Sequence, residues 1–251
     1  MLSPLLYSFF THDCKPVHGS NTIVKFADDT TVVGLVSNND ETAYREEVEH
    51  LAEWCANNNL ALNTKKTKEV IVDFRRNKDG THSPVHLSGE EVERVTSFKF
   101  LGVYISEDLS WTTNTSALVK KAHKRIFFLR KLAKLHLSSQ VLMNFYRCTI
   151  ESILSTCISV WYGNCTVKDK KSLQRVVKIA QRIIKMPLPS IASVYEKRCL
   201  RRARNIIRDS SHPNHRLFIP HVAPALGHAT TASRVEPTGL RTASSLQQSD
   251  C

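Results

Sequence analysis

Two periodicities divide the chain. In its first half, apolar and polar residues alternate in short runs typical of half-buried strands. Residues 21–36, NTIVKFADDTTVVGLV, predict two strands around a turn, and further strands are predicted over 69–74, 85–95 and 97–106. Between them lies an amphipathic helix whose apolar residues are Tyr44, Val48, Leu51 and Cys55. Gly89 is predicted at a hairpin turn, and Gly102 at a bulge or a close backbone approach.

Helical periodicity replaces the strand pattern after Trp111. Helices are predicted over about 115–135, from Ser138 to Trp161, over 168–186 and over 194–209. Strands first and helices later indicate an α+β portion followed by an all-α bundle, with a boundary near 109–115. Residues 222–251 are rich in Ala, Ser, Thr, Gly, Pro and Gln, and this composition predicts a disordered tail. The expected domains are therefore 1–110, 111–221 and 222–251.

Composition narrows the class of protein. With 251 residues, 41% of them hydrophobic, the chain can bury a core. Its seven cysteines form no C-x-x-C pair, which argues against a disulfide framework. Cys199, His212 and His215 are too irregularly spaced for a zinc site, and we expect loop or structural roles for them. No apolar run is long enough to cross a membrane and no signal peptide is recognisable, so we expect a soluble intracellular protein, nuclear or cytoplasmic.

The charge is unevenly distributed. The net charge is +12, but residues 115–205 hold 20 Lys and Arg against three Asp and Glu, a local net charge of +17. The remaining residues are mildly acidic. This asymmetry favours a nucleic-acid-binding module, the alternatives being a solvated helix surface or a membrane-surface patch.

The paired carboxylates Asp28 and Asp29 have two interpretations. Asp is ordinary in hairpin turns, where it hydrogen-bonds its own main chain. Two carboxylates at a rigid hairpin tip can also bind hard divalent cations such as Mg²⁺. These residues alone do not decide between a turn and a metal site.

Four motifs in a fixed order carry a family resemblance. They are LSPLLY (2–7), FADD (26–29), LALNTKKTK (60–68) and FKFLGVYI (98–105). In this order they resemble the reverse transcriptase of non-LTR (LINE-type) retrotransposons, a class of transposable element, over about residues 2–215. The resemblance implies an RNA-directed DNA polymerase with a β-strand palm followed by a basic, helical thumb domain.

The resemblance also implies residue roles. Asp28 and Asp29 would ligate catalytic Mg²⁺, and Lys66 would approach the triphosphate, with Lys65 and Lys68 as competitors. Phe98, Lys99 and Gly102 would belong to the primer grip, which holds the primer strand. The expected partners are an RNA template and an RNA–DNA hybrid, while the oligomeric state is left open. The basic residues expected to contact nucleic acid are Lys120, Lys121, Lys124, Lys171, Arg175, Lys178, Arg182 and Lys185.

One departure from the family pattern matters. The family's third metal-binding aspartate lies on a strand well before L-S-P, whereas Leu2-Ser3-Pro4 here follows Met1, and Asp13 is wrongly placed to substitute. We therefore expect a truncated, catalytically inactive fragment with a partial palm, which leaves open whether the chain is itself an enzyme. The alternatives are a non-catalytic module that binds RNA or RNA–DNA hybrids, and an inert retroelement-derived reading frame. Residues 119–135 also faintly resemble the N-terminal segment of AlkB-homologue tRNA-modifying proteins, a similarity of helix composition that indicates no function.

Overall fold

The chain folds into two compact units. The computed structural model describes residues 3–75, 82–218 and 240–247. One unit, here called the sheet unit, comprises Met1–Leu109 with Arg234–Cys251, and the other, the helical unit, comprises Ser110–Ser233. The strands thus lie in one unit and nearly all the helices in the other, an arrangement compatible with the α+β class.

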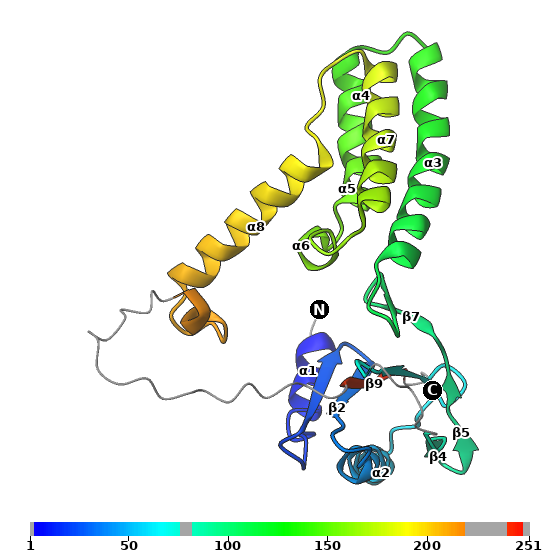
Figure 1. Cartoon of the computed structure of the whole chain (residues 1–251), viewed down its shortest axis with the longest axis vertical. Coiled ribbons are helices and arrows are strands. Elements are labelled where there is room, and N and C mark those ends of the chain that lie inside the picture. The colour runs from blue at the N-terminus through cyan, green and yellow to red at the C-terminus, as the bar shows by residue number, and fades with distance from the viewer. Residues whose placement is uncertain (1–2, 76–81, 219–239, 248–251) are drawn as a thin grey trace. The chain divides into compact units, whose positions relative to one another are not determined.

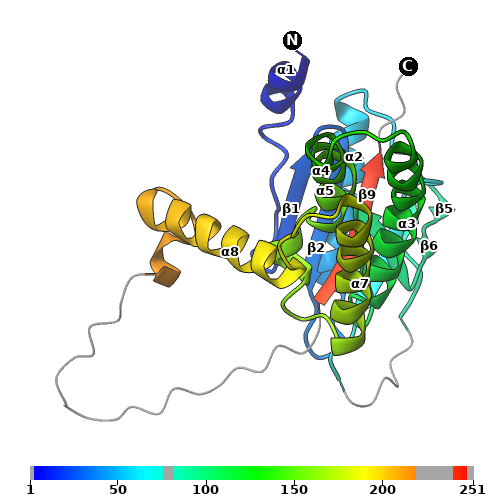
Figure 2. The same ribbon diagram turned by 90° about the horizontal axis from the view of Figure 1, so that it is seen from above.

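The sheet unit contains a five-stranded sheet and two small hairpins (Figures 1 and 2). Its helices are α1 (Ser3–Phe10) and α2 (Thr42–Asn57). Its strands are β1 (Asn21–Phe26), β2 (Asp29–Leu35), β3 (Lys68–Val72), β4 (His86–Leu87), β5 (Glu90–Glu91), β6 (Glu93–Arg94), β7 (Ser97–Phe100), β8 (Val103–Ser106) and β9 (Leu240–Gln247). The sheet has the order β1-β2-β9-β3-β6, while β4–β5 and β7–β8 pair separately.

Helix α2 covers one face of this sheet. Its apolar residues Tyr44, Val48 and Leu51 are buried against Val32 of β2, as the sequence periodicity predicts. Gly34 of β2 allows the close approach, because a Cβ there would lie 2.7 Å from Cδ2 of Tyr44. Helix α2 and the sheet therefore fix the position of the β1–β2 hairpin.

Strand β9 comes from a segment that the sequence assigned to a disordered tail. Residues 240–247 instead pair antiparallel with both β2 and β3, whereas 222–239 and 248–251 lie outside the described residues. The backbone explains the difference: β2 and β3 each present a row of N–H and C=O groups, and an extended segment between them satisfies both rows. Sequence composition carries no information about such open edges.

Both predicted glycine positions are hairpin turns. Ser88 and Gly89 join β4 to β5 with φ of 52° and 81°, and Leu101 and Gly102 join β7 to β8 with φ of 44° and 89°. Two consecutive positive φ values define the tight turn that twisted hairpins favour. Gly102 is therefore a turn residue and not a bulge, and nothing lies within 4 Å of a Cβ built on it.

The helical unit is built from long amphipathic helices. They are α3 (Thr112–Lys134), α4 (Ser139–Tyr146), the π-helical segment η1 (Arg147–Glu151), α5 (Ser152–Leu154), α6 (Ile158–Trp161), α7 (Val167–Ile184), α8 (Ile191–Arg208) and the short 3₁₀ helix η2 (His215–Phe218). Helix α3 packs against α4 and α7, and the three lie side by side in Figure 1. Their inward-facing residues, among them Ile126, Leu129, Leu173 and Val177, are almost completely buried.

The helix predicted from Ser138 to Trp161 is interrupted twice. Ser138 caps its start by accepting a hydrogen bond from the amide of Val141, 3.4 Å away. The π-helical turn η1 follows, and Cys157 then adopts a left-handed φ of 49°. Thr149 and Ser152 donate to the carbonyls four residues before them, at 2.7 and 2.6 Å. Such side-chain bonds compete with the helical ladder and bend helices, which explains the departure from a continuous helix.

Candidate functional site

Asp28 and Asp29 lie at the tip of the β1–β2 hairpin. Phe26 pairs directly with Asp29, so only Ala27 and Asp28 form the turn. Ala27 has a φ of 52°, a left-handed conformation that carries a steric cost for a residue with a Cβ. Ser88 and Leu101 also have a positive φ at the other two hairpin turns, so this conformation belongs to the tight turn itself.

The two carboxylates differ in environment. Asp28 is exposed, while Asp29 is half-buried. Oδ1 of Asp29 is buried and has no hydrogen-bond partner among the residues that the structure describes. A buried carboxylate oxygen normally has a partner, so this atom fits a ligand that brings positive charge. Hard divalent cations prefer such oxygen donors, and the pair therefore has the right chemistry for Mg²⁺.

The nearby cysteines are unsuited to metal binding. Cys14 and Cys55 are both buried, and burial raises the pKa of the Cys14 thiol and raises the pKa of Cys55 to about 11. Metal ligation needs the thiolate, which these pKa values disfavour. No group of three or more His, Cys, Asp or Glu suited to a metal occurs within 3–75, 82–218 and 240–247. Oxygen ligands from Asp28 and Asp29 are thus what this region of the sheet unit offers a cation.

A buried carboxylate anchors the base of the hairpin. Glu47 of α2 is completely buried, and both of its oxygens accept from the amide of Val17, at 3.1 and 3.0 Å. Oε2 also accepts from the amide of His18 and from Nδ2 of Asn21, both at 3.2 Å. Lys25 of β1 adds a second anchor, because its ammonium donates to the carbonyl of Cys14 at 2.9 Å. These bonds attach the loop before β1 to α2 and hold the hairpin in place.

Lys66 lies at the same end of the sheet as the carboxylates. In the register of β9, Asp29 pairs with Gln247, while Lys68 of β3 pairs with Ser244. The chain before Lys68 therefore runs toward the end of the sheet at which Asp29 lies. Because β9 lies between β2 and β3, these two strands are two strand spacings, or about 10 Å, apart. Lys66 is exposed, in a turn where its amide donates to Oδ1 of Asn63 at 3.1 Å. The topology thus brings Lys66 and the carboxylate pair to the same end of the sheet.

The β7–β8 hairpin presents only part of its predicted nucleic-acid-binding set. Phe98 is 8% exposed and packs against Val70 and Val72 of β3. Its ring holds the hairpin on the sheet and is not free to contact a nucleic acid. Lys99 and Gly102 are exposed.

The predicted basic residues of the helical unit all face solvent. Lys120, Lys121 and Lys124 of α3 are exposed. On α7 and its C-cap, the exposed basic residues are Lys171, Arg175, Lys178, Arg182 and Lys185, opposite a buried stripe that includes Leu173 and Val177. This one-sided arrangement fits contact with an extended polyanion.

Helix α8 adds basic residues that the sequence did not assign to the site. Lys197, Arg201, Arg204 and Arg208 line one open groove on this helix. Arg198 instead anchors the helix, because its guanidinium donates to the carbonyl and the hydroxyl of Ser155 at 2.9 and 2.8 Å. The many basic residues of 194–209 indicated that this helix could contribute to the site. The sequence does not show which arginines face solvent and which hydrogen-bond to another helix.

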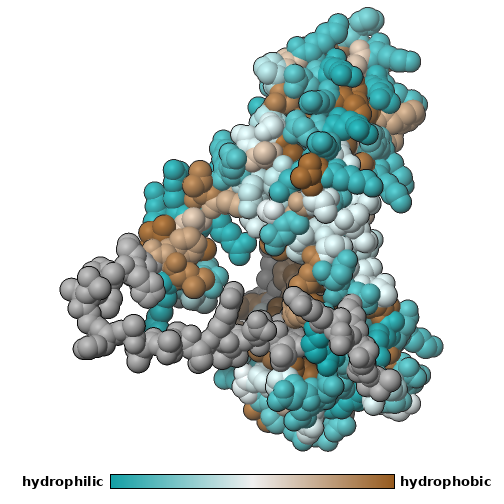
Figure 3. Space-filling view, in the orientation of Figure 1, coloured by the Kyte–Doolittle hydropathy of each residue, from teal (hydrophilic) through white to brown (hydrophobic). Residues whose placement is uncertain are grey.

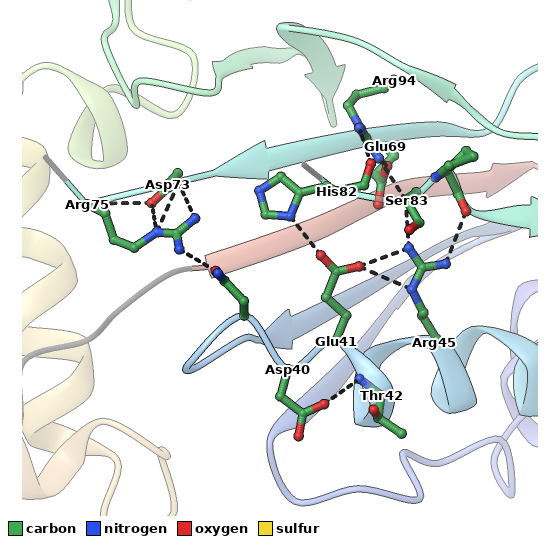
Figure 4. A network of polar contacts seen from close by, with 12 residues as sticks. Asp40, Glu41, Thr42, Arg45, Glu69, Asp73, Arg75, His82, Ser83 and Arg94 are labelled. Atoms are coloured by element: carbon green, nitrogen blue, oxygen red, sulfur yellow. Dashed lines mark hydrogen bonds and ion pairs between the residues drawn. The ribbon is translucent and has the colours of Figure 1, made fainter. Parts of the chain in front are cut away.

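A polar network marks the other end of β2 and β3 (Figure 4). Glu41, just before α2, accepts from Arg45 at 2.9 Å and lies 2.7 Å from Nδ1 of His82. Asp73 accepts from Arg75, and this hydrogen bond lowers the pKa of Asp73 to about 2. The charges here are paired with one another, so the network has a structural explanation.

The histidines weighed for zinc make local hydrogen bonds. Nδ1 of His212 accepts from the amide of Asn214 at 3.0 Å, and Nδ1 of His215 lies 3.0 Å from the carbonyl of Ile206. Within the described ranges, no helix is both long and apolar enough to cross a membrane.

Comparisons with known proteins give two family matches. The family model described as reverse transcriptase (RNA-dependent DNA polymerase) matches residues 1–105, which include the β1–β2 hairpin, Lys66 and the β7 strand. A second family model, described as alkylated DNA repair protein alkB homolog 8, N-terminal, matches residues 111–152. No curated protein and no solved structure matches the chain significantly. The first match supports a reverse-transcriptase fragment, whose family implies nucleic-acid partners and generally uses Mg²⁺.

Proposed function

We propose that this chain carries the catalytic hairpin of a non-LTR (LINE-type) reverse transcriptase, followed by a thumb-like helical domain that binds nucleic acid. The observation that carries the proposal is the hairpin itself. Within the segment similar to reverse transcriptases, it holds Asp28 and Asp29 at a tight turn, with a carboxylate oxygen that has no partner among the described residues. The order of the motifs from Leu2 to Ile105 supports the non-LTR type.

Asp28 and Asp29 are the residues that would hold Mg²⁺. Bound there, the ion would supply the charge neutralisation that nucleotidyl transfer needs on the attacking and leaving oxygens. The side chains around it have separate tasks. Lys66, at the same end of the sheet, would offer an ammonium to the negative charge of a triphosphate, and the exposed Lys99 would be available to a primer phosphate.

We further propose that the chain on its own is catalytically inactive. A two-metal site for nucleotidyl transfer is built from more than two carboxylates in the family that the motifs resemble, and the hairpin supplies two. Template-directed primer extension by the purified chain, lost in Asp28→Asn, would contradict this part of the proposal.

The helical unit supports a second, non-catalytic candidate function. All eight predicted basic contacts on α3, on α7 and at the C-cap of α7 are exposed. They are therefore available to bind the phosphates of an RNA–DNA hybrid without any catalytic step. The match to the alkB homolog 8 model covers little beyond α3, α4 and η1. That segment contains no aspartate, so by itself it provides no H-x-D iron site and we assign no oxygenase activity from it.

Binding of Mn²⁺, a spectroscopic substitute for Mg²⁺, tests the metal site. Electron paramagnetic resonance reports the free ion as protein is titrated in. We expect Asp28→Asn combined with Asp29→Asn to weaken Mn²⁺ binding by about tenfold or more, since loss of even an outer-shell group costs about that much. Asp13→Asn is the matched control, because Asp13 is an exposed carboxylate near the hairpin but not on it. Equal Mn²⁺ binding by the double variant and the wild type would refute the metal site.

A further inference from the structure

Helix α3 carries a second stripe beside its core-facing one. The core stripe consists of Ala122, Ile126 and Leu129, all buried to within 1%. The second stripe has spacings of four, three, four and three and ends at the C-cap of the helix. It consists of two basic residues followed by three apolar ones: Lys121, Arg125, Phe128, Leu132 and Leu135. Phe128 is 48% exposed and Leu135 is 68% exposed. This stripe is therefore not core, and its large apolar groups face solvent.

The second stripe forms one wall of an open groove. The groove is shallow and open, and Phe145 of α4 lines it together with residues of α3 and its C-cap: Arg125, Phe128, Lys131, Leu132 and Leu135. We call it the α3–α4 groove. On the face of the helical unit that Figure 3 shows, hydrophobic residues are scattered among hydrophilic ones. A concave site with two aromatic rings and two cations suits a flat, apolar ligand that carries negative charge nearby.

The charge around the groove selects an anionic ligand. Helix α3 contains seven Lys and Arg and no Asp or Glu. The groove lining itself holds Arg125 and Lys131 and no carboxylate. A neutral helix of a protein partner would gain from the apolar rings but not from the excess of cations.

The aromatic groups favour a nucleobase over a lipid surface. Phe127 and Phe128 are neighbours with ring centroids 5.6 Å apart, and Nζ of Lys131 lies 4.8 Å from the Phe127 centroid. The Phe127 ring is thus engaged by a cation, while Phe128 and Phe145 line the groove. A bilayer is bound by a convex apolar face, whereas a groove between two helices fits the edge and face of a planar base.

We infer that the α3–α4 groove binds an unpaired nucleobase of single-stranded nucleic acid. Phe128 and Phe145 supply stacking surface, and Arg125 and Lys131 contact the flanking phosphates. This goes beyond the proposed polymerase role, because the bases of an RNA–DNA hybrid are paired and inaccessible to stacking. It also does not depend on Asp28 or Asp29, so base binding in the groove and metal binding at the hairpin are tested independently of one another.

The test is the affinity of the full chain for a fluorescent twelve-residue oligouridine. Stacking on one aromatic residue contributes about 1–3 kcal/mol, so we expect Phe128→Ala to weaken binding by about 5- to 150-fold. Phe128→Trp should retain the affinity, and its added indole emission should be quenched when the oligonucleotide binds. Phe74→Ala is the matched control, because Phe74 is 53% exposed but lies in the sheet unit.

Three results would overturn the inference. One is an equal effect of Phe128→Ala and Phe74→Ala on oligouridine binding. Another is an equal loss of hybrid binding and oligouridine binding in Phe128→Ala, which would indicate a general fault in the helical unit. The third is loss of binding to phosphatidylserine vesicles in Phe128→Ala while oligouridine binding is kept, which would identify a membrane-binding face. Unchanged hybrid binding with lost oligouridine binding is the expected result.

Discussion

At the residue scale, the buried carboxylate of Glu47 fixes the position of the hairpin that carries the candidate metal site. Glu47 is completely buried, and it accepts hydrogen bonds from three donors of the segment 17–21 that leads into β1. Such a carboxylate has a high cost of burial that only its hydrogen bonds offset. The consequence is that the hairpin tip, with Asp28 and Asp29, is positioned by a residue 18 or more positions away in the sequence.

Replacing Glu47 by Gln tests this role. All three donors can bond Oε2, and among the described residues Oε1 accepts only from the amide of Val17. In glutamine an NH2 group takes the place of one oxygen, so a buried donor faces the Val17 amide, and the charge that strengthens the remaining hydrogen bonds is lost. We expect the free energy of unfolding to fall by about 1–3 kcal/mol in Glu47→Gln, measured by urea denaturation. Glu46→Gln is the control, since Glu46 is half-exposed and its ion pair is with His18. A Glu47→Gln variant as stable as Glu46→Gln would mean that the hydrogen bonds of Glu47 do not hold the hairpin.

At the residue scale, the sequence singles out candidate site residues but does not show which neighbouring side chains are buried. The pair Asp28–Asp29 stood out because two carboxylates interrupt apolar strands. Nothing in the local sequence indicated that Glu47 would be buried, because it lies among the acidic residues Glu46 and Glu49 on an exposed-looking helix. Its burial depends on a loop 30 residues earlier, which periodicity cannot reveal.

At the element scale, local patterns predicted the strands and helices but not their partners. The hairpins at 21–36 and 97–106 and the helices of the second half follow from alternation and periodicity. The π-helical turn depends on Ser and Thr side chains that bond the preceding turn, which a stripe of apolar positions does not encode. Strand β9 was missed because pairing with β2 and β3 is a non-local property of open edges.

Removal of residues 234–251 tests the contribution of β9. The strand is the only link between β1–β2 and β3–β6 in the sheet as the described residues define it, since β2 and β3 each pair with β9. Its loss leaves two rows of backbone groups unpaired. We expect a chain that ends at residue 233 to lose the cooperative unfolding of the sheet unit while the helical unit still melts cooperatively, as hydrogen exchange resolved by segment would show. Unchanged protection of β2 and β3 amides would mean that β9 is dispensable.

At the scale of the whole molecule, the sequence changes in periodicity and charge near the boundary between the two units. The change from alternation to helical periodicity, together with the +17 segment, separates a strand-containing part from a basic helical part. The structure divides the chain between Leu109 and Ser110, and its described basic faces on α3, α7 and α8 lie within the second unit. The sequence could not predict the α3–α4 groove, because a groove requires two helices to be placed against one another.

The most direct test of the proposed function is binding of the chain to a fluorescent RNA–DNA hybrid across a salt series. If α7 grips phosphates, the logarithm of the affinity falls linearly with the logarithm of the salt concentration, with a slope of about −0.9 for each phosphate contacted in B-DNA. Replacing Lys171, Arg175 and Lys178 together by Gln should make that slope shallower by about two to three, whereas replacing the exposed Lys15 of the sheet unit by Gln should not change it. A hybrid that fails to bind at about 50 mM salt, or that binds with the same slope after the α7 substitutions, would contradict a nucleic-acid-binding thumb.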